Sequence, residues 1–300
     1  MSLCARFHRV EEVLVAARRR LARRGALFFL DYDGTLTPIA ERPEEARLSE
    51  RALAVVRRLA ADPRCRVAVV SGRRLSEVQE LVGVPGLAWA GNHGLELAWP
   101  VAAPEAPGAA EGAAGAAGAT HGATLGEMAG WVHPGAIGAR GSLEVVARAP
   151  QLSSWPGVWV EDKRLTLTVH YRQAGPEVGP KLGELLAGII KRRPDIELRR
   201  GKMSYEVRPR LGWDKGRAVL RLVRELAPQG GWGLFYAGDD ETDDDALRAV
   251  RRLPDPSVGI MVGRGGEGPA DFCLRDTGDL LEVLETLAQE RPWHARGPAK

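Results

Sequence analysis

The sequence predicts an α/β fold in which a parallel sheet is flanked by helices and carries a smaller inserted α+β module. Five short apolar runs of strand type alternate with segments whose apolar residues recur at helical spacing, the pattern of parallel strands joined by helices. Aspartates follow the first and fourth of these runs directly. A block in the middle of the chain alternates apolar and polar residues, which is typical of a sheet with one wet face.

The elements of the parallel sheet can be read in order along the chain. Strands are predicted at residues 26–31, 66–72, 86–91, 233–240 and 257–263. Helices are predicted at residues 49–61, 214–226 and 243–253.

The middle of the chain predicts the insertion. Residues 101–130 are dominated by Ala and Gly, whose small side chains cannot form a firm core, so we expect a flexible loop there. We expect residues 1–100 and 208–300 to form the core domain and 101–207 the inserted module. The elements predicted for this module are strand-forming residues 158–172, a helix at 179–193 and strands at 196–200 and 203–209.

Composition excludes several classes of protein. The 42 basic and 39 acidic residues leave a formal charge of only +3, and no aromatic-basic pattern accompanies the arginines, so we expect no nucleic-acid partner. No run is long and uncharged enough to cross a bilayer, so we expect no membrane association. Cys4, Cys65 and Cys273 are scattered and lack metal-type spacing, which argues against a disulfide framework or a zinc site. A cytoplasmic protein is expected.

Polar residues stand directly after the predicted strands. Asp31 and Asp33 follow the first, Ser71 the second and Asp239 the fourth. Ligands of open parallel sheets bind at the carboxyl ends of the strands, and carboxylates from two strand ends suit Mg²⁺, which binds phosphate in turn. Each element also has a plainer interpretation: a turn at "DGT", a helix N-cap at Ser71, and charge at a helix N-terminus in "DDETDDD".

The order of the motifs favours the chemical interpretation. "DYDGTLT", "VVSGR", "DKG" and "GDDETDDD" together resemble the four motifs of the haloacid dehalogenase-like (HAD) phosphatase superfamily. "GNHGLE", "VEDKRLTLTVHYR", "GKMSYEVRP" and "GWDKG" resemble trehalose-6-phosphate phosphatases more narrowly. The resemblance implies a HAD-like Rossmannoid core with an inserted α+β cap domain.

The resemblance also implies roles for the core residues. Asp31 becomes the nucleophile and Asp33 the general acid and base. Ser71 and Lys215 would bind the phosphoryl oxygens. Mg²⁺ would be held by Asp31, the backbone carbonyl of Asp33 and Asp239, with Asp243 close to the metal.

Sugar recognition is expected on the cap and on the loops beneath it. For Lys202 and Glu206 an ordinary cross-strand pair is the alternative, and for His93 a turn residue satisfied by backbone. The residues expected to bind substrate are Arg73, Asn92, His93, Glu96, Lys163, Lys202 and Glu206.

The implied activity is Mg²⁺-dependent hydrolysis of trehalose 6-phosphate through an aspartyl-phosphate intermediate. Two alternatives stay open: a capped phosphatase for another sugar phosphate, and a non-catalytic sugar-phosphate sensor, which could lose Asp31 without harm. The expected partners are the small-molecule sugar phosphate and, in the pathway, a trehalose-6-phosphate synthase.

Overall fold

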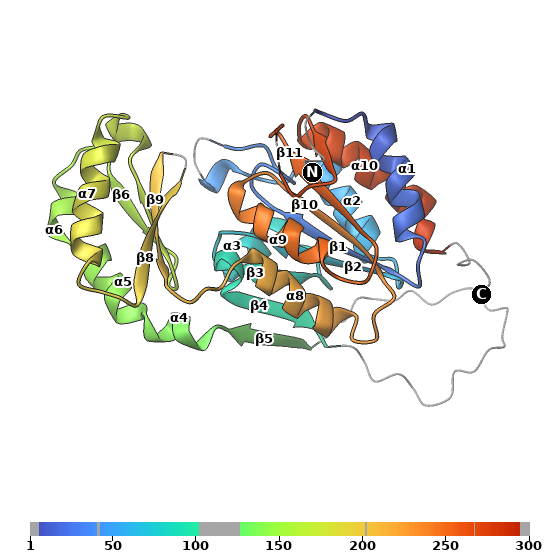
Figure 1. Ribbon diagram of the computed structural model, residues 1–300, viewed down its shortest axis with the longest axis horizontal. Helices are drawn as coiled ribbons and strands as arrows, with labels where there is room; N and C mark the ends of the chain where they lie inside the picture. Colours follow the sequence, from blue (N-terminus) through green and yellow to red (C-terminus); the bar gives the residue numbers. More distant parts are fainter. Residues whose placement is uncertain (1–5, 41–42, 102–126, 202, 267, 295–300) are drawn as a thin grey trace.

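The structure is a computed structural model that describes residues 6–40, 43–101, 127–201, 203–266 and 268–294. These residues form two β-sheets, each with helices of its own, that lie side by side (Figure 1). Most of the segment expected to be a flexible Ala/Gly loop, residues 102–126, lies outside the described residues, and so does Lys202.

The larger sheet has eight strands within the described part of the chain, in the order β12-β11-β10-β1-β2-β3-β4-β5. The strands from β12 to β3 are parallel, and β4 and β5 are antiparallel additions at one edge. All five predicted strands belong to the parallel part, so the predicted fold class is confirmed. The bounds are β1 (Ala26–Asp31), β2 (Cys65–Val70), β3 (Ala88–Gly91), β4 (Glu96–Pro100), β5 (Met128–Val132), β10 (Gly233–Gly238), β11 (Ser257–Val262) and β12 (Phe272–Leu274).

Helices cover both faces of this sheet because the side chains of its strands alternate between two apolar cores. Phe28 and Phe235 pack on one face, with ring centroids 5.1 Å apart, whereas Phe29 and Tyr236 point to the other. The helices on the first face are α1 (Val10–Leu21), α2 (Glu50–Ala60), α3 (Leu75–Val82) and α10 (Thr277–Glu290). Those on the second face are α8 (Lys215–Leu226) and α9 (Glu241–Arg251).

The smaller sheet is antiparallel, in the order β6-β7-β9-β8, and one of its faces is apolar. Leu167, Val169 and Val207 are fully buried on that face in a core shared with α5 and α7. The elements are β6 (Trp159–Asp162), β7 (Leu167–His170), β8 (Ile196–Gly201), β9 (Ser204–Pro209), α4 (Pro134–Gly138), α5 (Arg140–Ala147), α6 (Pro150–Ser153) and α7 (Val178–Ile190). Short 3₁₀ helices cover Pro43–Glu45, Asn92–Gly94, Arg172–Ala174 and Pro292–His294.

The other face of the smaller sheet is polar. Glu161, Thr168, Glu206 and Arg199 are paired across β6, β7, β9 and β8, so their side chains form one row on this face. The alternation of apolar and polar residues in the middle of the chain therefore does form a sheet with one apolar and one polar face.

The boundaries of the inserted module differ from the prediction. β5 pairs with β4, so residues 128–130 are not a loop and the chain leaves the larger sheet only after Val132. The indole of Trp131 gives the physical reason, because it packs 5.0 Å from that of Trp213. At the other end β9 reaches Pro209, so the module continues past the expected boundary at residue 207.

A small apolar cluster joins the two sheets where the chain passes between them. Leu95 belongs to the larger unit, whereas Ala136 and Leu165 belong to the smaller, and all three are buried together. Leu211 and Trp213, on the returning connection, pack against the cluster. This contact fixes the smaller unit beside the loops that follow β3.

One cysteine shows a bond that the sequence did not predict. Cys65 is buried and free, whereas Cys273 is disulfide-bonded. Cysteines that are far apart in the sequence can lie close together in the fold.

Among the described helices, none combines the length and the apolar composition that a bilayer span requires.

Candidate active site

The carboxyl end of β1 carries the first two aspartates. Asp31 is the last residue of the strand and is 4% exposed, and the chain then turns sharply at Gly34, whose φ is 84°. A side chain at Gly34 would lie 2.1 Å from Oδ2 of Asp239, the residue that follows β10. Glycine therefore lets the turn after β1 lie directly against the Asp239 carboxylate.

A buried lysine joins three elements at this point. Nζ of Lys215, the first residue of α8, lies 2.8 Å from Oδ1 of Asp31 and 2.8 Å from Oδ1 of Asp243. Asp243 is fully buried, and its Oδ1 also accepts a hydrogen bond from the Tyr236 hydroxyl at 2.6 Å. Its Oδ2 accepts the backbone N–H groups of Asp239 and Asp240, both at 3.1 Å. Asp243 thus fixes both Lys215 and the loop that carries Asp239.

The carboxylates outnumber the ammonium that faces them. Burial raises the pKa of Asp31, and it raises that of Asp239 to about 7, with added repulsion from Asp240 and Asp243. Burial would lower the pKa of Lys215, but Asp243 and Asp31 raise it, so the lysine stays charged. One cation cannot balance these carboxylates, and a second positive charge would favour their ionised forms.

The same carboxylates have the chemistry of a site for a hard cation. Oxygens of Asp31, Asp239 and Asp243 lie within 4.8 Å of one another. Both oxygens of Asp243 already accept hydrogen bonds, so those of Asp31 and Asp239 are better placed to meet an ion. Carboxylate oxygen is the ligand type that Mg²⁺ takes in proteins, so these residues fit such an ion.

Ser71 and Arg73 follow β2 beside Asp33. Ser71 Oγ accepts the backbone N–H of Arg73 at 3.1 Å. The N-cap of α3 is Arg74, so the plainer interpretation of Ser71 as a helix N-cap is wrong. Arg73 donates Nε and Nη2 to the two oxygens of Asp33 at 2.8 and 2.7 Å. Arg73 was expected to bind substrate, yet here it grips Asp33.

Asn92 and Glu96 lie where the two sheets meet. Asn92 is fully buried and donates Nδ2 to Glu96 at 2.5 Å and to the carbonyl of Lys163 at 3.1 Å. Its Oδ1 accepts the hydroxyl of Thr166 at 2.9 Å. The hydrogen-bonding groups of Asn92 are thus used within the protein, so this geometry supports a role in holding Lys163 in place.

His93 and Glu206 meet across the cleft between the two sheets. His93 has a left-handed backbone with φ of 57°, and its Nε2 lies 3.5 Å from Oε1 of Glu206 and 3.0 Å from Nη2 of Arg208. Burial and the charge of Arg208 lower the pKa of His93 to about 4, so its ring is neutral near pH 7. Burial would raise the pKa of Glu206, but His93 and Arg208 hold it well below its usual range.

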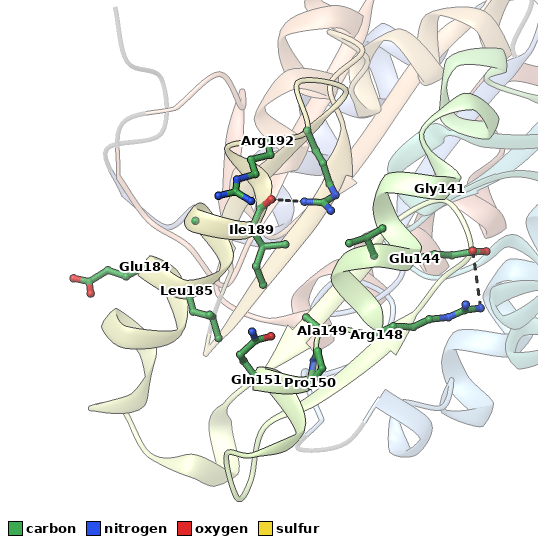
Figure 2. Close-up of a pocket in the computed structure, with 13 residues that line it drawn as sticks. Gly141, Glu144, Arg148, Ala149, Pro150, Gln151, Glu184, Leu185, Ile189 and Arg192 are labelled. Atoms are coloured by element: carbon green, nitrogen blue, oxygen red, sulfur yellow. Dashed lines mark hydrogen bonds and ion pairs between the residues drawn. The ribbon is translucent and has the colours of Figure 1, made fainter.

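A cavity of about 250 Å³ opens between these groups. Asp33, Arg73 and His93 line it from the larger unit, and Lys163 and Glu206 from the smaller one. A larger cavity of about 750 Å³ lies elsewhere, between α5, α6 and α7 (Figure 2). None of the residues predicted to form the active site lines that larger cavity. A third cavity, of about 650 Å³, is lined by two of them, Glu206 and Asp239. The smaller cavity is lined by more of them, Lys215 included, and is therefore the candidate site.

Comparison with known proteins shows the family of this chain. The family model described as Trehalose-phosphatase matches residues 29–109 and 146–270. This chain belongs to the trehalose-phosphatase family. A trehalose-phosphate phosphatase of Mycobacterium avium (strain 104) is 34% identical over 292 residues, 93% of this chain and 66% of the relative. Trehalose 6-phosphate phosphatase RA3 of Zea mays is 31% identical over 286 residues, 94% of this chain and 73% of the relative.

Solved structures of trehalose-phosphatases share the fold. The Aspergillus fumigatus trehalose-6-phosphate phosphatase has 28% identity and a TM-score of 0.61, covering 95% of this chain and 98% of the other. The C-terminal domain of the Candida albicans enzyme has 23% identity and a TM-score of 0.72, with coverage of 95% and 99%. The chain spans just under two thirds of the length of the mycobacterial relatives.

Sequence reasoning missed several residues of this trehalose-phosphatase cleft. Those of the smaller unit stand on the polar face of its sheet or just beyond it, and a signal was present because polar residues occupy every second position of β7 and β9. These residues are Glu161, Thr168, His170, Arg172, Ser204 and Arg208. In the larger unit, Asp240 also lines the cavity and was missed.

Asp239 predicts a pH dependence of stability in the metal-free protein. Its folded pKa of about 7 lies above the value of about 3.9 expected in the unfolded chain, so its ionisation opposes folding as the pH rises from about 4 to about 7. Asp239→Asn should therefore raise the free energy of unfolding at pH 8 by about 1–3 kcal/mol, and the gain should shrink toward pH 4.

Urea denaturation in the presence of a chelator measures this effect. Glu241→Gln, an exposed substitution on the same helix terminus, is the matched control and should show no such trend. If Asp239→Asn raised the free energy of unfolding more at pH 5 than at pH 8, burial and repulsion between the carboxylates would not be what raises the pKa of Asp239.

Proposed function

We propose that this chain hydrolyses trehalose 6-phosphate to trehalose and phosphate through an aspartyl phosphate on Asp31, with Mg²⁺ as cofactor. The observation that carries the proposal is the buried Asp31 carboxylate held 2.8 Å from the Lys215 ammonium, with Asp33 two residues further on at the edge of a polar cleft. The names of the relatives support the sugar.

Asp31 would act as the nucleophile. Its carboxylate attacks phosphorus, the bond from phosphorus to the sugar oxygen breaks, and an aspartyl phosphate forms. Lys215 offsets the repulsion between carboxylate and phosphate, and the Asp243 carboxylate keeps the ammonium in place. A Mg²⁺ ion held by Asp31 and Asp239, with the carbonyl of Asp33, would supply further positive charge to the phosphate oxygens.

Asp33 moves the protons in both half-reactions. It donates a proton to the departing sugar oxygen and then takes one from the water that hydrolyses the aspartyl phosphate. Its side chain is 41% exposed and lines the cavity, so it reaches the space where the sugar oxygen would lie. Ser71, which is buried next to Gly72 of the cavity lining, would bind a phosphoryl oxygen.

The polar face of the smaller sheet would recognise the sugar. Glu161, Lys163 and Glu206 line the cavity opposite the catalytic aspartates and offer both donors and acceptors to hydroxyl groups. Closure of this cap over the disaccharide would exclude water from the reacting phosphate. Lys202 is proposed to share this role from outside the described residues. A trehalose-6-phosphate synthase would supply the substrate.

The sugar and the cofactor are tested together by phosphate release from a panel of sugar phosphates with Mg²⁺ and with a chelator. We expect trehalose 6-phosphate to give the highest kcat/KM, at least about tenfold above glucose 6-phosphate or sucrose 6-phosphate, and chelation to abolish turnover. Preference for another sugar phosphate would replace the substrate. Binding without release of phosphate would indicate a sensor.

Asp31→Asn should lower kcat by about 10³-fold or more, because the amide keeps the shape of the side chain but cannot attack phosphorus. Circular dichroism should show an unchanged fold. Mass spectrometry of the variant excludes deamidation back to aspartate. Turnover within about tenfold of the wild type would remove Asp31 from the nucleophilic role.

Glu206→Ala should lower kcat/KM for trehalose 6-phosphate by roughly 10- to 10³-fold, from the loss of one or two charge-assisted hydrogen bonds. Hydrolysis of a small aryl phosphate should hardly change, because that substrate does not reach the cap. Glu184→Ala, at the distant cavity of Figure 2, is the matched control. Equal losses on both substrates would mean that Glu206 supports the core instead of the sugar.

A further inference from the structure

The guanidinium of Arg73 grips the carboxylate of Asp33 at both oxygens. Nε lies 2.8 Å from Oδ2 and Nη2 lies 2.7 Å from Oδ1, the geometry of a bidentate arginine–carboxylate pair. The Arg73 side chain is only 6% exposed, whereas that of Asp33 is 41% exposed. A rigid, buried partner thus holds a carboxylate that would otherwise turn freely in an open cleft.

Arg73 is itself fixed on several sides. Its Nη1 donates to Oε1 of Glu77 at 2.5 Å, one turn further along the chain on α3. Its guanidinium carbon lies 5.4 Å from the ring centroid of Tyr32, whose hydroxyl donates to the carbonyl of Ala46 at 2.7 Å. Its backbone N–H and carbonyl bond to Ser71 Oγ and to the N–H of Asn92. The two Arg73 nitrogens that bind Asp33, Nε and Nη2, are therefore held in position without a substrate.

We propose that Arg73 is a positioning residue that acts through Asp33, and that it is not a ligand of the sugar phosphate. The three guanidinium nitrogens of Arg73 already donate to the carboxylates of Asp33 and Glu77. Detaching this buried guanidinium from them to bind a substrate would cost free energy. Holding both Asp33 oxygens fixes the rotation of the carboxylate toward the cavity. The inference rests on the proposed acid–base role of Asp33.

A double-mutant cycle of Arg73→Met and Asp33→Asn tests this coupling. Arg73→Met should lower kcat by about 10- to 100-fold on both trehalose 6-phosphate and an aryl phosphate, with KM within about threefold, because orientation of an acid–base group is worth this much. In the Asp33→Asn background, which should itself lose about 10²-fold, the same substitution should change the residual kcat by less than about twofold.

The outcomes that overturn the inference are distinct. Losses that multiply in the double mutant would show that Arg73 acts independently of Asp33. A raised KM with kcat retained would make Arg73 a substrate ligand. If Asp33→Asn turns over like the wild type, the proposed acid–base role of Asp33 fails together with the positioning role of Arg73. If Asp33→Asn is impaired but the losses multiply, only the positioning role of Arg73 fails.

Glu77→Gln keeps the cycle informative if Arg73→Met does not fold. Removing the charge of Glu77 loosens the hold on Arg73 but leaves the guanidinium in place, so kcat should fall by about two- to fivefold, again only when Asp33 is present. Arg74→Met, which removes the same charge from an exposed neighbour, is the matched control and should leave kcat unchanged. An effect of Glu77→Gln that persists in the Asp33→Asn background would overturn the inference.

Discussion

The ammonium of Lys215, buried between the carboxylates of Asp31 and Asp243, is the interaction on which the rest of the site depends. It ties the first turn of α8 to the end of β1 and to the first turn of α9, the helix that follows β10. A charge this deeply buried is stable only when its partners are complete, and Tyr236 and two backbone N–H groups complete them through Asp243. The strand ends are therefore held in register by electrostatics as well as by packing.

The carboxylates at the ends of the strands differ in how many hydrogen bonds they accept from the protein. Asp243 has every oxygen lone pair directed at a protein donor, so it serves as a support. Asp31 and Asp239 place carboxylate oxygens within 4.8 Å of each other, an arrangement that a cation would stabilise. The same residue type thus serves structure or chemistry according to how many donors surround it.

Sequence reasoning recovered the parallel sheet and the strand-end aspartates because both are local signals. Apolar runs mark β1, β2, β3, β10 and β11, and a polar residue directly after such a run must lie at the rim of the sheet. The ion pair between Arg73 and Asp33 could not be predicted, because the motif "SGR" does not show where the side chain of a residue forty positions earlier points. The edge strand β5 was missed because Ala and Gly dominate the sequence around it, while its pairing with β4 depends on tertiary contacts of Trp131. The missed cleft residues Thr168 and His170 belong to an alternation that the sequence shows, but which face of the smaller sheet meets the larger unit is set by the fold alone.

In the smaller sheet, the residues that pack the core and the residues that face the cleft lie on opposite faces. Along β9, Ser204, Glu206 and Arg208 face the cleft, whereas Tyr205 and Val207 are packed against the helices behind it. Because the two sets alternate and occupy opposite faces, a change in one set leaves the packing of the other intact. Substitutions at alternate residues of β9 could therefore change what the polar face binds while the apolar face keeps its packing. The pleat of a β-strand thus lets one surface of this scaffold vary independently of the other.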